Sequence, residues 1–131
     1  MTRSIQPFLM FQGGDAEAAM QFYVSLFPDG TILELTRYAA GIAPEGKVMR
    51  AVFSVDGQKV MCTDSPVRHA FGFTPSSSLF VECESEAELD RLATALAGGG
   101  EVLMEPANHG FSRKFAWVSD RFGVSWQLNL D

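Results

Sequence analysis

Apolar residues in the first half of the chain occur first in a short run and then at helical spacing. Residues 5–11 form an apolar run of strand length, and Gly13-Gly14 ends it. Residues 16–27 carry apolar side chains at steps of three and four, which predicts an amphipathic helix with Asp15 as its N-cap. The expected buried face of this helix consists of Ala19, Met20, Tyr23, Leu26 and Phe27.

Strand-like patterns follow this helix. Residues 48–55 and 59–63 flank Asp56-Gly57, and an Asp-Gly pair between two apolar runs predicts a hairpin. Residues 31–38 alternate, which predicts a strand with two distinct faces. One face is expected to hold Ile32, Glu34, Thr36 and Tyr38, and the other Leu33, Leu35 and Arg37.

The second half repeats this order of elements. A strand is predicted over residues 77–83 and a helix over 86–97, where Ser85 and Glu88 have the spacing of a capping box. The two halves align at an offset of 69 residues, which indicates an internal duplication. Aligned pairs include Phe11 with Phe80, Glu17 with Glu86, and Gly30 with Gly99. Three further strands are predicted, over residues 101–105, 112–119 and 124–130.

These patterns predict an α+β fold built from two modules, each with the order strand, helix and three strands (βαβββ). Module one is expected over residues 1–66, a connecting segment over 67–74 and module two over 75–131. Because strands twist, the sheets should curl into a trough-like mixed sheet. A concave surface of this kind is where a small ligand is expected to bind.

Composition and charge exclude several classes of protein. A chain of 131 residues fits one domain and can bury a core without a metal or a disulfide. A net charge of −6 disfavours nucleic-acid binding, which needs a basic surface. No stretch reaches the roughly 18 apolar residues of a membrane span, and the first residues do not resemble a secretory signal. We therefore expect a cytoplasmic protein in which Cys62 and Cys83 stay reduced.

Six segments carry a resemblance to a known superfamily, and the last of them is the most specific. They are residues 7–11 (PFLMF), 17–23 (EAAMQFY), 27–28 (FP), 36–38 (TRY), 55–58 (VDGQ) and 120–128 (DRFGVSWQL). With these segments the chain resembles the vicinal oxygen chelate superfamily, which includes glyoxalase I, extradiol dioxygenases, and fosfomycin- and bleomycin-resistance proteins. The narrower resemblance is to the PhnB-like, demethylubiquinone methyltransferase-like branch. It implies the glyoxalase/bleomycin resistance fold and a homodimer.

The resemblance also implies where a metal would bind. Metal-dependent members use His, Glu or Gln on the first and last strand of each module. The matching positions in this chain are residues 7–9, 61–63 and 76–78 and Gln127. Of these, only Gln127 is of a ligand type that these members use. Divalent metals need several nitrogen or carboxylate ligands, so we predict no catalytic metal and no cofactor. The sequence also lacks a G-x-G-x-x-G turn, which argues against methyl transfer from S-adenosylmethionine.

Several side chains are candidate ligand contacts, and each also has a structural interpretation. Arg37 and Arg50 could bind an anion or lie at a sheet edge, and Asp64 could orient a ligand or cap a helix or turn. Tryptophans could line a pocket or fill the core, and His69 could bind a ligand or pack against aromatic rings. The predicted ligand-binding set is Arg37, Asp64, His69, Phe71, Phe73, Trp117, Trp126 and Gln127.

Two functional hypotheses follow. The first is a metal-free protein that binds a small aromatic or amphipathic molecule. The alternative is a metal-dependent lyase, isomerase or dioxygenase-type enzyme of the same superfamily, with Cys62, Asp64, His69 and Gln127 as its candidate residues. A weaker third option is a structural or regulatory dimer that has no ligand. Metal analysis of the purified protein discriminates between the first two.

Overall fold

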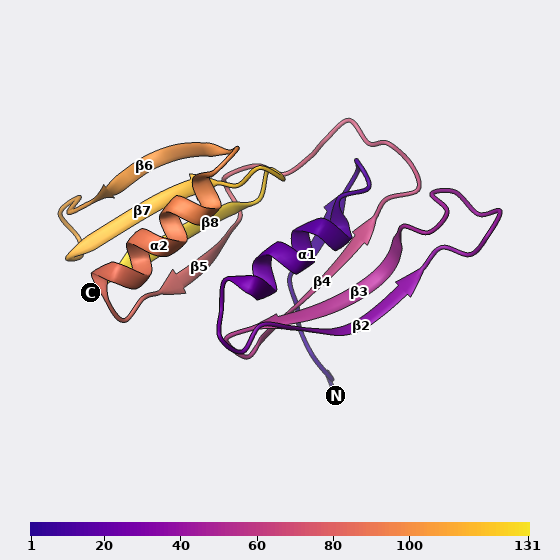
Figure 1. The fold of residues 1–131 in the computed structure, drawn as a ribbon, viewed down its shortest axis with the longest axis horizontal. Helices are drawn as coiled ribbons and strands as arrows, with labels where there is room; N and C mark the ends of the chain where they lie inside the picture. The colour runs from indigo at the N-terminus through magenta and orange to yellow at the C-terminus, as the bar shows by residue number, and fades with distance from the viewer. The chain divides into compact units, whose positions relative to one another are not determined.

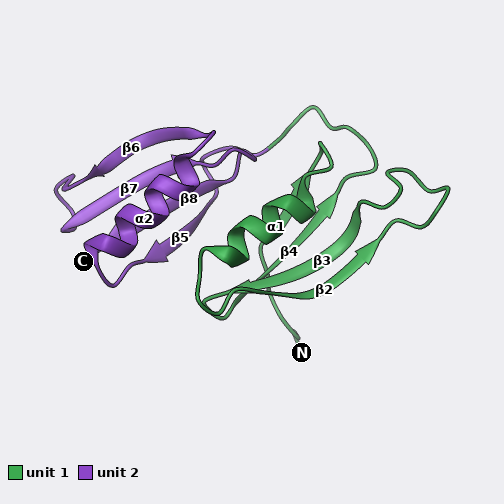
Figure 2. Ribbon diagram, in the orientation of Figure 1, with its two compact units in different colours: residues 1–72 green, residues 73–131 purple.

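The computed structural model covers residues 1–131, and the chain divides into two compact units, residues 1–72 and residues 73–131 (Figure 2). The division falls within the segment that was expected to connect two modules. No helix is both long enough and apolar enough to cross a membrane.

The first unit is a four-stranded mixed sheet with one helix (Figure 1). The strand order is β1-β4-β3-β2, in which β1 runs parallel to β4 and the other neighbours are antiparallel. Helix α1 covers one face of this sheet, and we call the opposite face of the sheet its open face. The elements are β1 (Phe8–Phe11), α1 (Ala16–Ser25), β2 (Thr31–Arg37), β3 (Val48–Val55) and β4 (Gln58–Asp64).

The core of the first unit lies between α1 and the sheet. Met20 and Tyr23 of the helix are fully buried, as are Phe53 and Val60 of the sheet, and the rings of Tyr23 and Phe53 lie 5.8 Å apart. Burial of these side chains is the main source of stability available to a unit of this size. The predicted buried positions Ala19, Met20, Tyr23 and Leu26 are confirmed, whereas Phe27 is only partly buried.

The predicted Asp-Gly hairpin is confirmed between β3 and β4. Asp56 and Gly57 have φ angles of 49° and 78°, which suit the tight turn between two twisted strands. Asp29, in the turn after α1, accepts hydrogen bonds from both backbone N–H groups, at 2.8 and 3.1 Å. The turn is therefore stabilised by a residue from outside the hairpin.

The predicted faces of β2 are wrong because the strand contains a β-bulge. Ile32 pairs with Phe53 and Glu34 with Val52, so Leu33 is an extra residue without a direct partner. An extra residue reverses the alternation beyond it. As a result, Ile32 and Leu35 are the half-buried positions of the strand, while Glu34 is turned to the open face.

The capping hydrogen bond of helix α1 does not come from the residue that its sequence suggested. The Asp15 side chain accepts no capping hydrogen bond. Instead, the Ala16 N–H donates to Oδ1 of Asp64, the last residue of β4, at 3.0 Å. Asp15 therefore occupies the N-cap position as predicted, but the capping hydrogen bond is made by a side chain distant in sequence.

The second unit repeats this topology with the strand order β5-β8-β7-β6, and β5 runs parallel to β8. Two four-stranded mixed sheets with one helix each confirm the predicted α+β class. The predicted capping box is also present, because the Glu88 N–H donates to Ser85 Oγ at 3.1 Å. The elements are β5 (Ser78–Glu82), α2 (Glu86–Ala97), β6 (Glu101–Ala107), β7 (Lys114–Ser119) and β8 (Ser125–Leu130).

Candidate functional site

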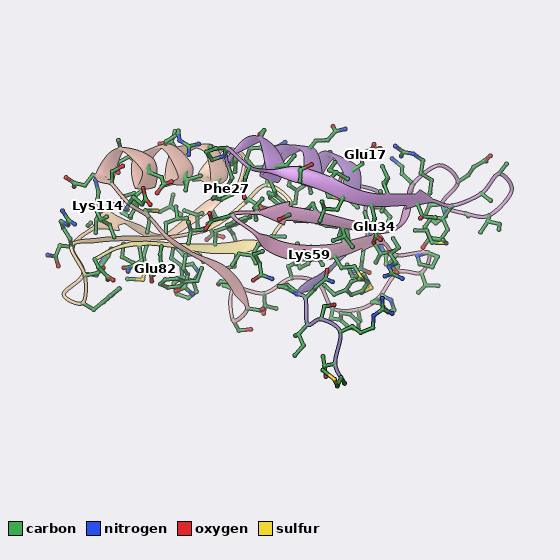
Figure 3. All side chains as sticks on the ribbon, turned by 90° about the horizontal axis from the view of Figure 1, so that it is seen from below. Glu17, Phe27, Glu34, Lys59, Glu82 and Lys114 are labelled. Carbon is green, nitrogen blue, oxygen red and sulfur yellow. The ribbon has the colours of Figure 1, made fainter.

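A cavity of about 820 Å³ lies on the open face of the first sheet. Strands β2, β3 and β4 supply its floor, and the segment before β1 supplies the rest of its wall. Figure 3 shows Glu34 and Lys59 on the side of the sheet away from α1, whereas Glu17 lies on the helix side. The lining residues are Met1, Arg3, Ser4, Gln6, Leu33, Glu34, Arg50, Val52, Lys59 and Met61.

The strand register explains why these side chains meet. Glu34 pairs with Val52, and Val52 pairs with Met61, so the three residues form one row across the sheet. The bulge at Leu33 brings Glu34 into this row. Val52 is only 4% exposed and Leu33 is 48% exposed, so the cavity has an apolar floor that a ligand can reach.

Charged side chains surround this apolar floor. Arg3, Arg50 and Lys59 are exposed, form no ion pair and donate no side-chain hydrogen bond. Glu34 is the one carboxylate among the lining residues, and it too forms no ion pair. A smaller hollow of about 260 Å³ lies beside Glu34, Thr36 and Arg50.

None of the eight predicted ligand contacts lines this cavity. Arg37 donates two hydrogen bonds to Glu17 of α1, at 2.6 and 2.8 Å, which places it on the helix side. Asp64 is 1% exposed, and its second carboxylate oxygen accepts a hydrogen bond from the Val48 N–H at 2.8 Å. Asp64 therefore acts as a helix cap, which is one of the two roles that the sequence indicated for it.

His69 and Phe71 lie together in the loop after β4. Their rings stack at 4.8 Å, and Gln12 accepts a hydrogen bond from the His69 N–H at 2.6 Å. The Gln12 amide also donates to the Phe71 carbonyl at 2.6 Å. The loop is thus attached to the end of β1 and presents Phe71, which is 63% exposed. Phe73 belongs to the second unit and lies beside Gly123.

Trp117 and Gln127 are directly opposite each other on β7 and β8, on the open face of the second sheet. Trp117 Nε1–H donates to Ser125 Oγ at 2.8 Å, and the Gln127 amide donates to Ser78 Oγ at 3.3 Å. The two serine hydroxyls are 2.6 Å apart and complete the network. This face therefore combines an indole ring with hydroxyl and amide groups.

Trp126 lies on the opposite side of the same sheet from Trp117. It is 1% exposed, and its Nε1–H donates to Asp120 Oδ2 at 3.0 Å. Asp120 also accepts hydrogen bonds from the N–H groups of Phe122 and Val124. The structure therefore places the Trp126 side chain in the core of the second unit, on the face of the sheet opposite to the Gln127 side chain.

The residues at the implied metal positions do not fit a divalent metal. Phe8 pairs with Met61 in the first sheet, whereas in the second sheet Gln127 pairs with Phe80, which lies two residues beyond the implied range 76–78. No three His, Cys, Asp or Glu side chains lie close enough together to hold a metal ion. Neither sheet offers the nitrogen and carboxylate ligands that such a metal needs.

The two cysteines are buried and free, as expected. Burial raises the pKa of the Cys62 thiol to about 12, with a smaller contribution from Asp64. Burial also raises the pKa of the Cys83 thiol to about 11. Thiols with pKa values this high are poor nucleophiles near neutral pH, so neither is suited to covalent catalysis.

Sequence reasoning missed most of the cavity. The sequence indicates Arg50 as a possible anion contact but does not indicate the other lining residues. Counting alternate positions along β2 does not reveal the bulge at Leu33, and without the bulge Glu34 appears to belong with Ile32. The signal available was the alternation of Arg50 and Val52 on β3, which is regular from Arg50 onwards.

Comparisons with known proteins place this fold in a family. A family model described as 3-demethylubiquinone-9 3-methyltransferase matches residues 3–129. A PhnB protein from Bacillus cereus is 48% identical over 98% of this chain and 100% of its own, with a TM-score of 0.93. A protein from Pseudomonas aeruginosa is 27% identical over 99% of this chain and 98% of its own, with a TM-score of 0.86.

A more distant structure shares the fold alone. It is a glyoxalase/bleomycin resistance protein from Albidiferax ferrireducens, 18% identical over 98% of this chain and 99% of its own, with a TM-score of 0.60. No curated protein matches the chain. The predicted glyoxalase/bleomycin resistance fold is confirmed, and the chain belongs to the PhnB-like family, described as 3-demethylubiquinone-9 3-methyltransferase.

Proposed function

We propose that this protein binds a small aromatic or amphipathic molecule in the cavity of the first sheet, without a catalytic metal. The observation that carries the proposal is the cavity itself, about 820 Å³ in volume with Leu33, Val52 and Met61 at its floor. Pockets for small molecules have volumes of roughly 300–1,000 Å³ and combine apolar walls with a few polar groups. Here four apolar residues line the cavity together with six polar or charged ones, a mixture that suits an amphipathic molecule.

The proposal includes no metal because of the residue types present. A divalent ion would find no set of ligands in Phe8, Met61, Ser78 and Phe80, and Gln127 supplies a single amide. Purified protein should therefore contain well under one zinc, iron or manganese ion per chain. A stoichiometric metal together with catalytic turnover would support the enzymatic alternative and overturn this part of the proposal.

The proposal also assigns no methyl transfer to this chain. Each sheet contains a single parallel pair of strands, whereas the Gly-rich nucleotide turn belongs to a mostly parallel sheet with helices between its strands. Gly13-Gly14 leads into α1 but lacks the G-x-G-x-x-G spacing. The family description therefore names the relatives of this chain and does not assign it methyl transfer.

Calorimetric titration with naphthalene-2-methanol, a neutral aromatic probe, tests the proposal. We expect saturable binding that Leu33→Asp weakens by about tenfold, because the bound ligand would bury the new carboxylate against an aromatic ring. Val102→Asp is the matched control, since Val102 is 45% exposed, close to the 48% of Leu33, but lies on β6. Equal losses in the two variants, or no saturable binding of this alcohol or of an aromatic anion of the same size, would contradict the proposed site.

A further inference from the structure

We infer that the ligand of this cavity is an amphipathic anion, whose carboxylate or phosphate group is held by Lys59 and Arg3. The inference rests on the proposed function and adds the charge of the ligand and the place of its head group. Its apolar body would lie across Met61, Val52 and Leu33, which form the floor of the cavity.

The first support is the charge of the cavity compared with that of the whole chain. The protein has ten basic and sixteen acidic residues, with a net charge of −6. The cavity reverses this balance, because its lining includes Arg3, Arg50 and Lys59 but only one carboxylate, that of Glu34. A local excess of positive charge on an acidic protein favours an anionic ligand.

The second support is that these three cations have no partner in the protein. Elsewhere Arg37 is bound to Glu17 at 2.6 Å, Lys114 to Asp90 at 2.8 Å, and Arg113 to the Asp131 carbonyl at 2.6 Å. The side chains of Arg3, Arg50 and Lys59 donate no hydrogen bond and form no ion pair. Their donors remain available to a ligand, and hydrogen bonds between ionised groups are the stronger kind.

The third support is the position of each cation along the sheet. Ser54 pairs with Lys59, and Arg50 lies four residues before Ser54, so Arg50 and Lys59 lie on either side of the pair Val52–Met61 at a separation of roughly 13 Å. Glu34 shares a hollow with Arg50, which lowers the attraction of that end for an anion. No carboxylate among the lining residues lies on β4 with Lys59, so we place the head group at that end.

The segment that carries Arg3 is attached to the sheet beside β4. Phe8 pairs with Met61, and the Met61 N–H donates to the Pro7 carbonyl at 2.9 Å. Residues 1–7 are not part of a strand, and this segment contributes Arg3 to the lining of the cavity, as β4 contributes Lys59. Arg3 and Lys59 line the same cavity, so both can reach one head group.

The test compares 2-naphthoate, 2-naphthyl phosphate and naphthalene-2-methanol, which share an aromatic body and differ in the head group. In calorimetric titrations of the full chain, we expect at least one anion to bind about tenfold more tightly than the alcohol. Added NaCl should weaken binding of the anion and leave binding of the alcohol almost unchanged. The stronger of the two anions identifies the head group as carboxylate or phosphate.

Matched variants locate the head group. Lys59→Met and Arg3→Met should remove most of the preference for the anion while the alcohol still binds. Lys47→Met and Arg68→Met are the controls, because neither residue lines the cavity. Glu34→Gln should strengthen anion binding, since it removes the one repelling carboxylate.

Two outcomes would overturn the inference. If the alcohol binds as tightly as both anions, or if the control variants lose as much anion binding as Lys59→Met, the inferred head-group site is wrong and the proposed function stands. If neither the alcohol nor an anion binds saturably, the proposed function itself fails, and the inference fails with it.

Discussion

Asp64 and Ala16 are 48 residues apart in sequence, yet the Asp64 carboxylate caps helix α1 by accepting the Ala16 N–H at 3.0 Å. The other carboxylate oxygen accepts the Val48 N–H at 2.8 Å, and the side chain is 1% exposed. One buried residue thus connects the start of α1, the start of β3 and the end of β4.

Replacing Asp64 should therefore destabilise the protein. In Asp64→Asn one oxygen becomes an NH₂ group that faces a backbone donor, so a buried N–H loses its acceptor. We expect a loss of about 2–4 kcal/mol in the free energy of unfolding, measured by urea denaturation. Asp15→Asn is the control and should change stability by less than about 0.5 kcal/mol, since the Asp15 side chain makes no capping hydrogen bond. Equal effects of the two substitutions would show that Asp64 is not the cap.

The two tryptophans should differ in their accessibility to solvent. In a Trp117→Phe variant the remaining Trp126 is 1% exposed, so its fluorescence should resist quenching by acrylamide. In a Trp126→Phe variant the remaining Trp117, on the open face, should be quenched more readily. Trp126→Phe should also cost about 1–3 kcal/mol, because Asp120 loses a buried hydrogen-bond donor. Similar quenching of both variants would contradict the assigned faces.

We predict that the protein loses stability at alkaline pH because its two thiols are buried. Folding raises the pKa of Cys62 from 9.0 to about 12 and that of Cys83 from 9.0 to about 11, since burial disfavours the thiolate. This contribution is fully present below pH 9 and is lost as the pH rises through the folded-state values. The free energy of unfolding of the wild type, measured by urea denaturation, should therefore fall above pH 9. It should fall less in a Cys62→Ala, Cys83→Ala double variant.

Reaction with a thiol reagent checks the same burial. At pH 8 the folded protein should react slowly with Ellman's reagent, and both thiols should react rapidly after unfolding in urea. Rapid reaction of the folded protein would contradict the burial of Cys62 and Cys83.

A homodimer is expected on two grounds. The family resemblance implies one, and each sheet has two edge strands, β1 and β2 or β5 and β6, whose outer backbone groups can pair. Light scattering coupled to size-exclusion chromatography should give twice the 14.3 kDa mass of the chain. A mass of 14.3 kDa at every concentration tested would exclude the dimer.

The sequence predicted the order of elements well because that order depends on local patterns. Helix α2 begins and ends where it was predicted, since the Ser85 cap and the glycines after Ala97 are local signals. Helix α1 ends at Ser25, two residues before its predicted end, where the Leu26 N–H bonds to the Tyr23 carbonyl. Strand β6 extends past its predicted end and includes Pro106, which an edge strand tolerates.

The candidate site was harder to predict because it depends on pairing between distant segments. The bulge at Leu33 arises from the register of β2 against β3, and no residue type in β2 indicates its position. Arg37 and Arg50 had the same possible roles in the sequence. Only the structure shows that Arg37 is bound to Glu17 and that Arg50 faces the cavity.

The strand orders also bear on how the chain completes its backbone pairing during synthesis. Each sheet is made of consecutive strands, and in each sheet the first strand pairs with the last. All strands of the first sheet have therefore been made once the ribosome has added Asp64, before any strand of the second sheet exists. Pairing of β1 with β4 must wait for that point, so β1 remains without its partner for most of the synthesis of the first unit.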